Sequence, residues 1–184
     1  MAEVAAFHIA RIEYRIRAAG YPLRLTLDAA YQPFLGAVHS PGWVHPIEVE
    51  ARVGELSIEP GWQQLFEAGD VWRLFASGNR RIIVRYAGTR SEPLCAAVMD
   101  EEVRSVDVLC SQRLVGATVE GPCLENPIHY PLDQLLLIRA LGPRGVLVHS
   151  AAASSGRRGV LLAGVSGAGK TTISRLLHAH GPIR

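Results

Sequence analysis

A glycine-rich stretch near the end of the sequence, GVSGAGKTT at residues 164–172, constrains the fold more than any other segment. It follows the apolar run 159–163 and precedes a segment in which Ile173, Leu176 and Leu177 fall at helical spacing. Glycines permit backbone conformations that other residues avoid, so successive N–H groups can turn toward one point. The stretch therefore predicts a strand, a tight loop and a helix over residues 171–180.

The spacing Gly-x-x-x-x-Gly-Lys-Thr is typical of loops that bind phosphate groups. Loop amides and the positive end of the following helix attract anions. Lys170 would bridge the β- and γ-phosphates, Thr171 would offer its hydroxyl to Mg²⁺, and Thr172 could donate to the α-phosphate. We expect ATP and Mg²⁺ as cofactors; a glycine turn without a ligand is the alternative. The nine residues of this expected nucleotide site are Gly164, Val165, Ser166, Gly167, Ala168, Gly169, Lys170, Thr171 and Thr172.

Lys170 is the only lysine among the nineteen lysines and arginines of the chain. A bias toward arginine explains the other basic positions, so a retained lysine marks a place where a guanidinium cannot substitute. A site where a compact ammonium group has to reach phosphate oxygens is such a place. The single lysine thus supports a phosphate-binding role for the same loop.

Composition excludes several classes of protein. With 48% hydrophobic and 20% charged residues over 184 positions, the chain is typical of a soluble globular protein. A net charge of +2 is too small to predict a nucleic-acid or membrane partner. Cys95, Cys110 and Cys123 form no Cys-x-x-Cys pair, so we expect buried, reduced thiols and a cytoplasmic protein. The oligomeric state stays open, with a homo-oligomer as one option.

The spacing of apolar residues changes between residues 127 and 128, which divides the chain into two parts. Residues 1–127 predict a β-rich domain of antiparallel strands, with a hairpin joining 12–17 to 23–27. Alternating apolar residues predict further strands over 47–53, 71–76, 81–86, 94–98 and 103–110. Residues 128–184 predict a helix from Pro131 to Gly142 and then a strand hairpin, 146–153 and 159–163, ahead of the loop. The expected fold class is therefore mixed α/β: a β-rich unit followed by the start of a nucleotide-binding core.

His149 is a further candidate site residue. If the hairpin turns near residues 155–156, antiparallel pairing places His149 opposite Leu162 or Ala163, beside the mouth of the loop. There a histidine could hydrogen-bond a phosphate or a catalytic carboxylate. The alternative interpretation is a histidine of the core whose ring nitrogens are hydrogen-bonded within the protein.

The segment VLVHSAAASSGRRGVLLAGVSGAGKTTISRLL, residues 146–177, resembles the nucleotide-binding core of the HPr serine kinase/phosphorylases and their relatives. That group is related in fold to phosphoenolpyruvate carboxykinases. The resemblance covers residues 130–184 and includes a histidine before the hairpin, matched by His149, and the loop lysine, matched by Lys170. It implies a kinase that transfers a phosphoryl group from ATP to a hydroxyl of a protein serine or a small molecule, with both residues catalytic.

The family's kinases also carry adjacent acidic residues on the strand after the first helix, one for Mg²⁺ and one as general base. That strand would begin near Ile183, so we expect the chain to be truncated and to lack the full catalytic apparatus. Residues 1–127 do not match the family's N-terminal domain, so HPr itself is not implied as the acceptor. A transport or motor ATPase of the ABC type and a non-catalytic nucleotide-binding module remain alternatives.

Overall fold

The computed structural model describes residues 4–24, 34, 45–88, 92–155 and 158–179. The chain forms two compact units, which we call the first unit (residues 1–142) and the second unit (residues 143–184). Each unit is described by itself. The first contains most of the strands, and the second contains the glycine-rich loop.

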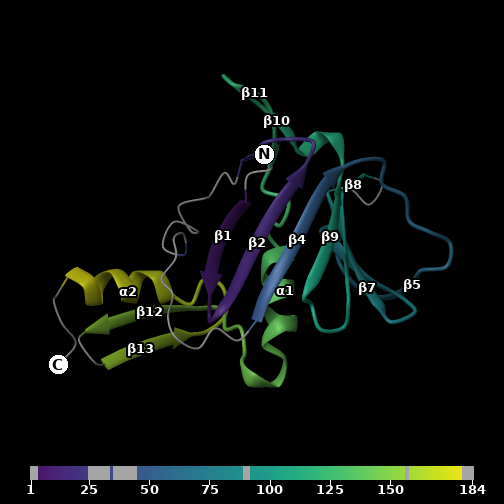
Figure 1. The fold of residues 1–184 in the computed structure, drawn as a ribbon. Coiled ribbons are helices and arrows are strands. Elements are labelled where there is room, and N and C mark those ends of the chain that lie inside the picture. The colour runs from purple at the N-terminus through teal and green to yellow at the C-terminus, as the bar shows by residue number, and fades with distance from the viewer. Residues whose placement is uncertain (1–3, 25–33, 35–44, 89–91, 156–157, 180–184) are drawn as a thin grey trace. The chain divides into compact units, whose positions relative to one another are not determined.

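The first unit is built on an eight-stranded sheet with the order β1-β2-β4-β9-β8-β7-β6-β5 (Figure 1). The pairs β2–β4 and β4–β9 are parallel, and the other neighbouring pairs are antiparallel. Its strands are β1 (Val4–Ile9), β2 (Ile12–Ala19), β4 (His45–Val53), β5 (Gln63–Ala68), β6 (Trp72–Ser77), β7 (Arg80–Tyr86), β8 (Pro93–Met99) and β9 (Ser105–Cys110).

The described residues of the first unit also form a smaller sheet and one α-helix. The sheet has the order β10 (Val115–Thr118), β11 (Gly121–Glu125) and β3 (Leu23–Arg24), and β3 pairs in parallel with β11. The helix is α1 (Leu132–Leu141). Short 3₁₀ turns cover Gln112–Leu114 and Gly142–Arg144.

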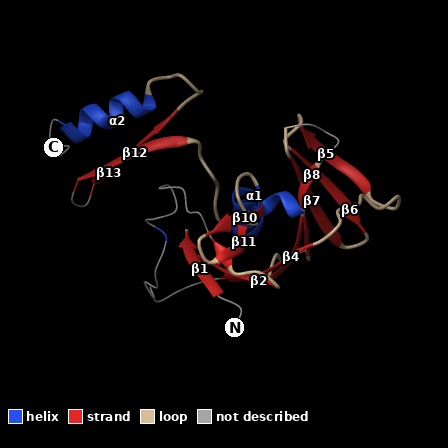
Figure 2. Cartoon of the chain, turned by 90° about the horizontal axis from the view of Figure 1, so that it is seen from above, coloured by secondary structure: helices blue, strands red, loops and turns tan. Residues whose placement is uncertain are grey.

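The main core lies between α1 and one face of the large sheet (Figure 2). Leu132, Leu136 and Ala140 recur every four residues and are buried, which places one stripe of the helix on the sheet. On β2, Tyr14 is fully buried and stacks on Phe7 of β1, with 4.5 Å between ring centroids. The Tyr14 hydroxyl donates to the main-chain oxygen of Asp133 at 2.9 Å, which gives its polar end a partner inside the core.

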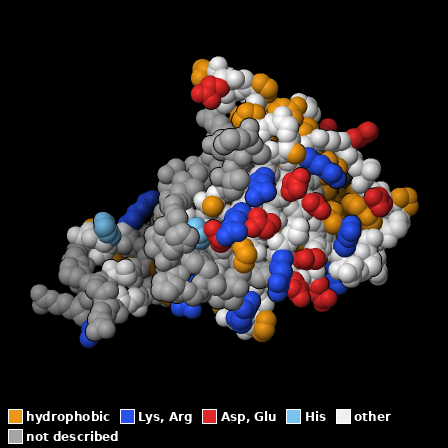
Figure 3. Space-filling model, in the orientation of Figure 1, with side chains coloured by type: hydrophobic (Ala, Val, Ile, Leu, Met, Phe, Trp, Pro, Cys, Tyr) orange, Lys and Arg blue, Asp and Glu red, His pale blue; other side chains and the backbone are white. Residues whose placement is uncertain are grey.

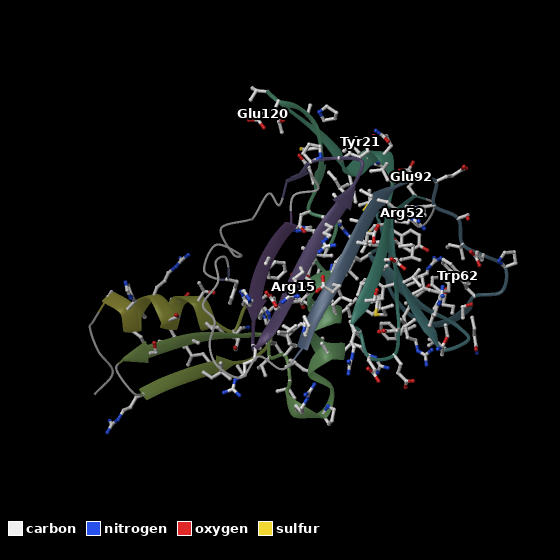
Figure 4. All side chains as sticks on the ribbon, in the orientation of Figure 1. Arg15, Tyr21, Arg52, Trp62, Glu92 and Glu120 are labelled. Atoms are coloured by element: carbon white, nitrogen blue, oxygen red, sulfur yellow. The ribbon has the colours of Figure 1, made fainter. Side chains whose placement is uncertain are left out.

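The opposite face of the sheet carries many charged side chains, acidic and basic ones interspersed (Figure 3). Arg15 of β2, labelled in Figure 4, donates to Glu13 at 2.6 Å and to Glu48 of β4 at 3.0 Å. The hydrogen bond from Arg15 lowers the pKa of Glu13, while burial opposes that shift. Because these pairs are solvent-exposed, they add little to stability. Among the described residues of this face, the mixture of signs leaves no concentrated basic surface.

The second unit consists of a hairpin and a helix. β12 (Ser150–Ser155) pairs antiparallel with β13 (Arg158–Ala163), and α2 (Lys170–Ala179) packs on the hairpin. The half-buried residues Ala151, Val160 and Leu162 point to one face, whereas Leu161 on the other face is 60% exposed. No described side chain of this unit is fully buried. The unit therefore has a thin apolar layer between helix and hairpin in place of a core.

This architecture overturns the expected mixed α/β fold with a nucleotide-binding core. The structure is mostly β, with 49% strand and 18% helix, and its large mixed sheet belongs to the first unit. The strands beside the glycine-rich loop form an antiparallel pair, not the parallel sheet that an α/β core requires. The error has a physical cause: apolar alternation predicts that a segment is a strand, but it does not identify the partner strand.

Two local expectations were also wrong. The expected hairpin of 12–17 with 23–27 does not form in the described residues, because β2 pairs with β1 and β4, while β3 pairs with β11. Residues 25–27 of that expected hairpin lie outside the described part of the chain. The N-terminal strands are not purely antiparallel either, since two central pairs of the large sheet are parallel. The predicted helix forms as α1, but it packs in the core of the first unit.

Candidate functional site

The glycine-rich loop connects the end of β13 to the start of α2. Its Ala168 amide donates to the Val165 carbonyl at 3.2 Å, which closes a turn, and the Ile173 amide donates to the Gly169 carbonyl at 3.0 Å, which begins the helix. Gly167 and Gly169 have φ values of 81° and 77°. Side chains strongly disfavour this left-handed region, so the two glycines are required by the local path of the chain.

The loop presents several amide donors that no main-chain oxygen of the described residues accepts. In the described part of the chain, the amides of Ser166, Gly167, Gly169 and Lys170 have no main-chain acceptor. Residues 164–168 are exposed, so solvent or a ligand can reach this segment. Lys170 is the first residue of α2, so these amides lie at the positive end of the helix dipole. Such an arrangement favours an anion.

Lys170 folds back over the loop. Its Nζ donates to the carbonyl oxygens of Gly164 and Val165, both at 2.8 Å. An ammonium group has three N–H donors, so these bonds leave one free for a ligand. The two carbonyls fix the position of the charge at the start of α2 before any ligand arrives. The partners of the Lys170 ammonium group are main-chain oxygens, so no side-chain pattern in the sequence could indicate these two contacts.

The two threonines follow Lys170 in the first turn of α2 and are exposed. Thr171 is the residue that could hold Mg²⁺. Among the described residues, no group of three or more His, Cys, Asp or Glu side chains could hold a metal ion. Mg²⁺ keeps several waters and binds through one or two protein oxygens and substrate phosphates, so a single hydroxyl is compatible with it.

His149 lies just before β12 and is exposed. The observed register pairs Ser150 with Ala163 and Ala151 with Leu162, so the two expected partners of His149 lie opposite the two residues that follow it. His149 is therefore the residue that precedes the pair at the base of the loop. The expected strand over 146–153 starts only at Ser150.

Ser174 is a site-supporting residue that sequence reasoning missed. Its hydroxyl donates to the Ala152 carbonyl at 3.4 Å and links α2 to β12. A serine four residues after Lys170 would be the sequence signal, but serines on helices more often face solvent. This contact helps to hold the first turns of α2 against the hairpin that carries the loop.

No protein-family model matches the sequence, and comparisons with curated proteins and with solved structures find no match. Among the described residues, no helix has the length and apolar character needed to span a bilayer. The site is therefore interpreted from its own geometry and from the motif.

Replacing Gly169 with alanine is expected to weaken binding of pyrophosphate by roughly 5- to 30-fold. The reason is that a left-handed backbone costs a side-chain-bearing residue about 1–2 kcal/mol, so the loop would leave its present shape. Gly159→Ala is the matched control, because Gly159 has no positive φ and its nearest neighbour to an added Cβ is 3.9 Å away. Isothermal titration calorimetry measures both. An equal loss in the two variants would show that the loop conformation is not responsible.

Proposed function

We propose that residues 164–172 bind the phosphate groups of ATP together with Mg²⁺, and that the protein is a kinase that transfers a phosphoryl group to a hydroxyl of a protein serine or a small molecule. The supporting observation is the ammonium of Lys170, held 2.8 Å from two loop carbonyls at the N-terminus of α2. It lies beside the amides of Ser166, Gly167 and Gly169, which lack main-chain acceptors among the described residues.

Each residue has a distinct task in this proposal. The free N–H of Lys170 and the loop amides hold the β- and γ-phosphate oxygens and offset their negative charge. The Thr171 hydroxyl would hold Mg²⁺, which would supply positive charge to offset the negative charge of the phosphates. The Thr172 hydroxyl donates to the α-phosphate. Because phosphoryl transfer needs little covalent chemistry from the protein, such positioning and charge stabilisation account for most of its catalysis.

His149 has a positioning task in the proposal. It precedes the strand whose first residue pairs with Ala163, and Ala163 is the last strand residue before the loop. A histidine can donate a hydrogen bond to a phosphate oxygen in this region. We assign it to the orientation of the γ-phosphate.

Nucleotide binding without transfer is the second candidate function, and the sequence gives a specific reason for it. Residues 143–184 contain no aspartate and no glutamate. A kinase uses a carboxylate as the base for the acceptor hydroxyl. The base for transfer therefore has to come from outside this segment. Formation of ADP in the presence of serine peptides and small alcohols separates the two candidates, because a binding module gives no turnover.

Calorimetric titration with ATP, GTP and pyrophosphate, with and without Mg²⁺, tests the binding proposal. We expect all three to bind, because the loop contacts phosphates and not the base, and we expect Mg²⁺ to strengthen ATP binding. Pyrophosphate should displace ATP competitively. Absence of binding by pyrophosphate, or ATP binding that pyrophosphate leaves unaffected, would refute a phosphate-centred site.

A further inference from the structure

Two buried cysteines face each other in the large sheet of the first unit. Cys95 on β8 and Cys110 on β9 are register partners in an antiparallel pair. Directly opposite residues of such a pair point to the same face, and here that face is the main core. Both residues are 0% exposed and carry free thiols.

The hydrogen bonds beside the pair identify its type. The Ser111 amide donates to the Leu94 carbonyl at 2.8 Å, so the neighbouring pair, Leu94 opposite Ser111, is the hydrogen-bonded kind. Pairs alternate along an antiparallel ladder, and Cys95 and Cys110 are therefore a non-hydrogen-bonded pair, with Cα atoms typically about 4.5 Å apart. Disulfides occur at Cα separations of about 4.4–6.8 Å. The typical Cα separation of this pair type thus falls within the range at which disulfides form.

An arginine lies on the third strand of the same row. Arg85 on β7 is the register partner of Cys95, and its Nη1 is buried and has no hydrogen-bond partner in the described part of the chain. Burial raises the pKa of the Cys95 thiol to about 11, and the nearby positive charge of Arg85 opposes that effect. Burial, and then the neighbouring Cys95, raise the pKa of Cys110 to about 12. Both sulfurs are therefore thiols at neutral pH in the folded state.

We propose that Cys95 and Cys110 form a disulfide that joins β8 to β9 within the core. The bond forms while the chain folds or opens, when the thiols can ionise, because thiolates and not thiols attack disulfides.

A small disulfide such as oxidised glutathione is the oxidant. One cysteine loses its proton, its thiolate attacks a sulfur of glutathione disulfide, and one glutathione thiolate leaves. The second cysteine, deprotonated in turn, attacks the mixed disulfide and expels the other glutathione. The two cysteines are oxidised by two electrons, and the two glutathione thiolates take up the two protons that the cysteines lose, so the glutathione disulfide is reduced to two thiols.

Cys123 is not part of the pair. It is buried on β11, where its register partner is Gly116 of β10. β11 belongs to the smaller sheet and does not pair with β8 or β9. The chain therefore supplies its own control cysteine.

The proposal is tested by unfolding the protein, refolding it in reduced and oxidised glutathione, and blocking the remaining thiols with N-ethylmaleimide. Trypsin cleaves after arginine, and the sequence then gives peptides 91–104, 105–113 and 114–139, each with one cysteine. We expect an intact mass lower by two hydrogen atoms, one blocked thiol, and a linked pair of peptides 91–104 and 105–113. Reduction should separate them.

Cys123→Ser should leave this linkage intact, and Cys110→Ser should abolish it. The oxidised wild type should also unfold at a higher urea concentration than its reduced form. Three free thiols after refolding, or a linked species that contains peptide 114–139, would overturn the proposal. The peptide map of the wild type decides the question even if a variant fails to fold.

Discussion

Replacement of Lys170 with alanine is expected to weaken the binding of Mg²⁺ and ATP by roughly 10- to 150-fold, because a hydrogen bond to a charged group contributes about 1.5–3 kcal/mol. The substitution has a second consequence. It removes the two bonds that tie the side chain to the carbonyls of Gly164 and Val165, so the loop loses its internal support along with its charge. Titration calorimetry at fixed ionic strength measures the affinity, and circular dichroism confirms that the variant folds.

The control for Lys170→Ala is Arg158→Ala, which removes a positive charge from the same hairpin. Arg158 is the first residue of β13, whereas the loop follows its last residue. At about 3.3 Å per residue the strand separates Arg158 from the loop by roughly 17 Å, about twice the screening length at physiological salt. We therefore expect little effect on affinity. Equal losses in both variants would indicate general electrostatic attraction, and an unchanged affinity in Lys170→Ala would remove the proposed site.

Lys170→Arg tests whether the positive charge alone is enough, or whether the shape of the ammonium group is also needed. The guanidinium keeps the positive charge, but it is planar and larger than an ammonium group, so it fits poorly between two carbonyls that accept from one nitrogen. We expect this variant to bind ATP more weakly than the wild type.

Where the sequence carries a short-range signal, it predicted the structure well. The strands β4, β6, β7 and β8 and both α-helices form within a few residues of their expected bounds. The three cysteines are buried, as expected. The helix after the loop was indicated by the spacing of apolar residues and forms as α2. These features depend on the residues of one segment.

Features that depend on which strands pair with each other were not predicted from the sequence. The β1–β2 hairpin turns through Ala10 and Arg11, with φ values of 51° and 67°. Two-residue turns with positive φ usually contain asparagine or glycine, so these two residues gave no signal. β5 was missed because five of its six residues are exposed and show no alternation. Without β1 and β5, neither edge of the large sheet could be placed.

In the candidate site, too, features set by one segment were predicted, and features set by strand pairing were not. The glycine spacing identified the positions that adopt positive φ at Gly167 and Gly169. The hairpin register, which decides where His149 lies, differs from the expected one by one or two residues, because Ser150 and not His149 pairs with Ala163. The carbonyl partners of Lys170 could not be predicted, because every residue offers the same main-chain oxygen. Side-chain chemistry was thus readable from the sequence, whereas its placement depended on the backbone.

Leu136→Ala is expected to lower the free energy of unfolding of the first unit by about 2–5 kcal/mol, the range observed when a buried leucine is truncated. Leu136 is 0% exposed and lies in the stripe of α1 that packs on the large sheet. Alanine would remove its apolar contacts and leave a cavity between the two layers. Because few domains exceed 15 kcal/mol of stability, this loss is a large fraction of the total.

The design of this measurement follows from the sequence. All tryptophans, Trp43, Trp62 and Trp72, lie in residues 1–142, so tryptophan fluorescence during urea unfolding reports on the first unit alone. Gln134→Ala is the matched control, since Gln134 is exposed on the same helix and surface substitutions usually change stability by less than about 0.5 kcal/mol. Similar midpoints for the two variants would mean that α1 does not hold the sheet. A large shift for Leu136→Ala, with ATP affinity unchanged, would show that the helix stabilises the first unit and is not needed for phosphate binding.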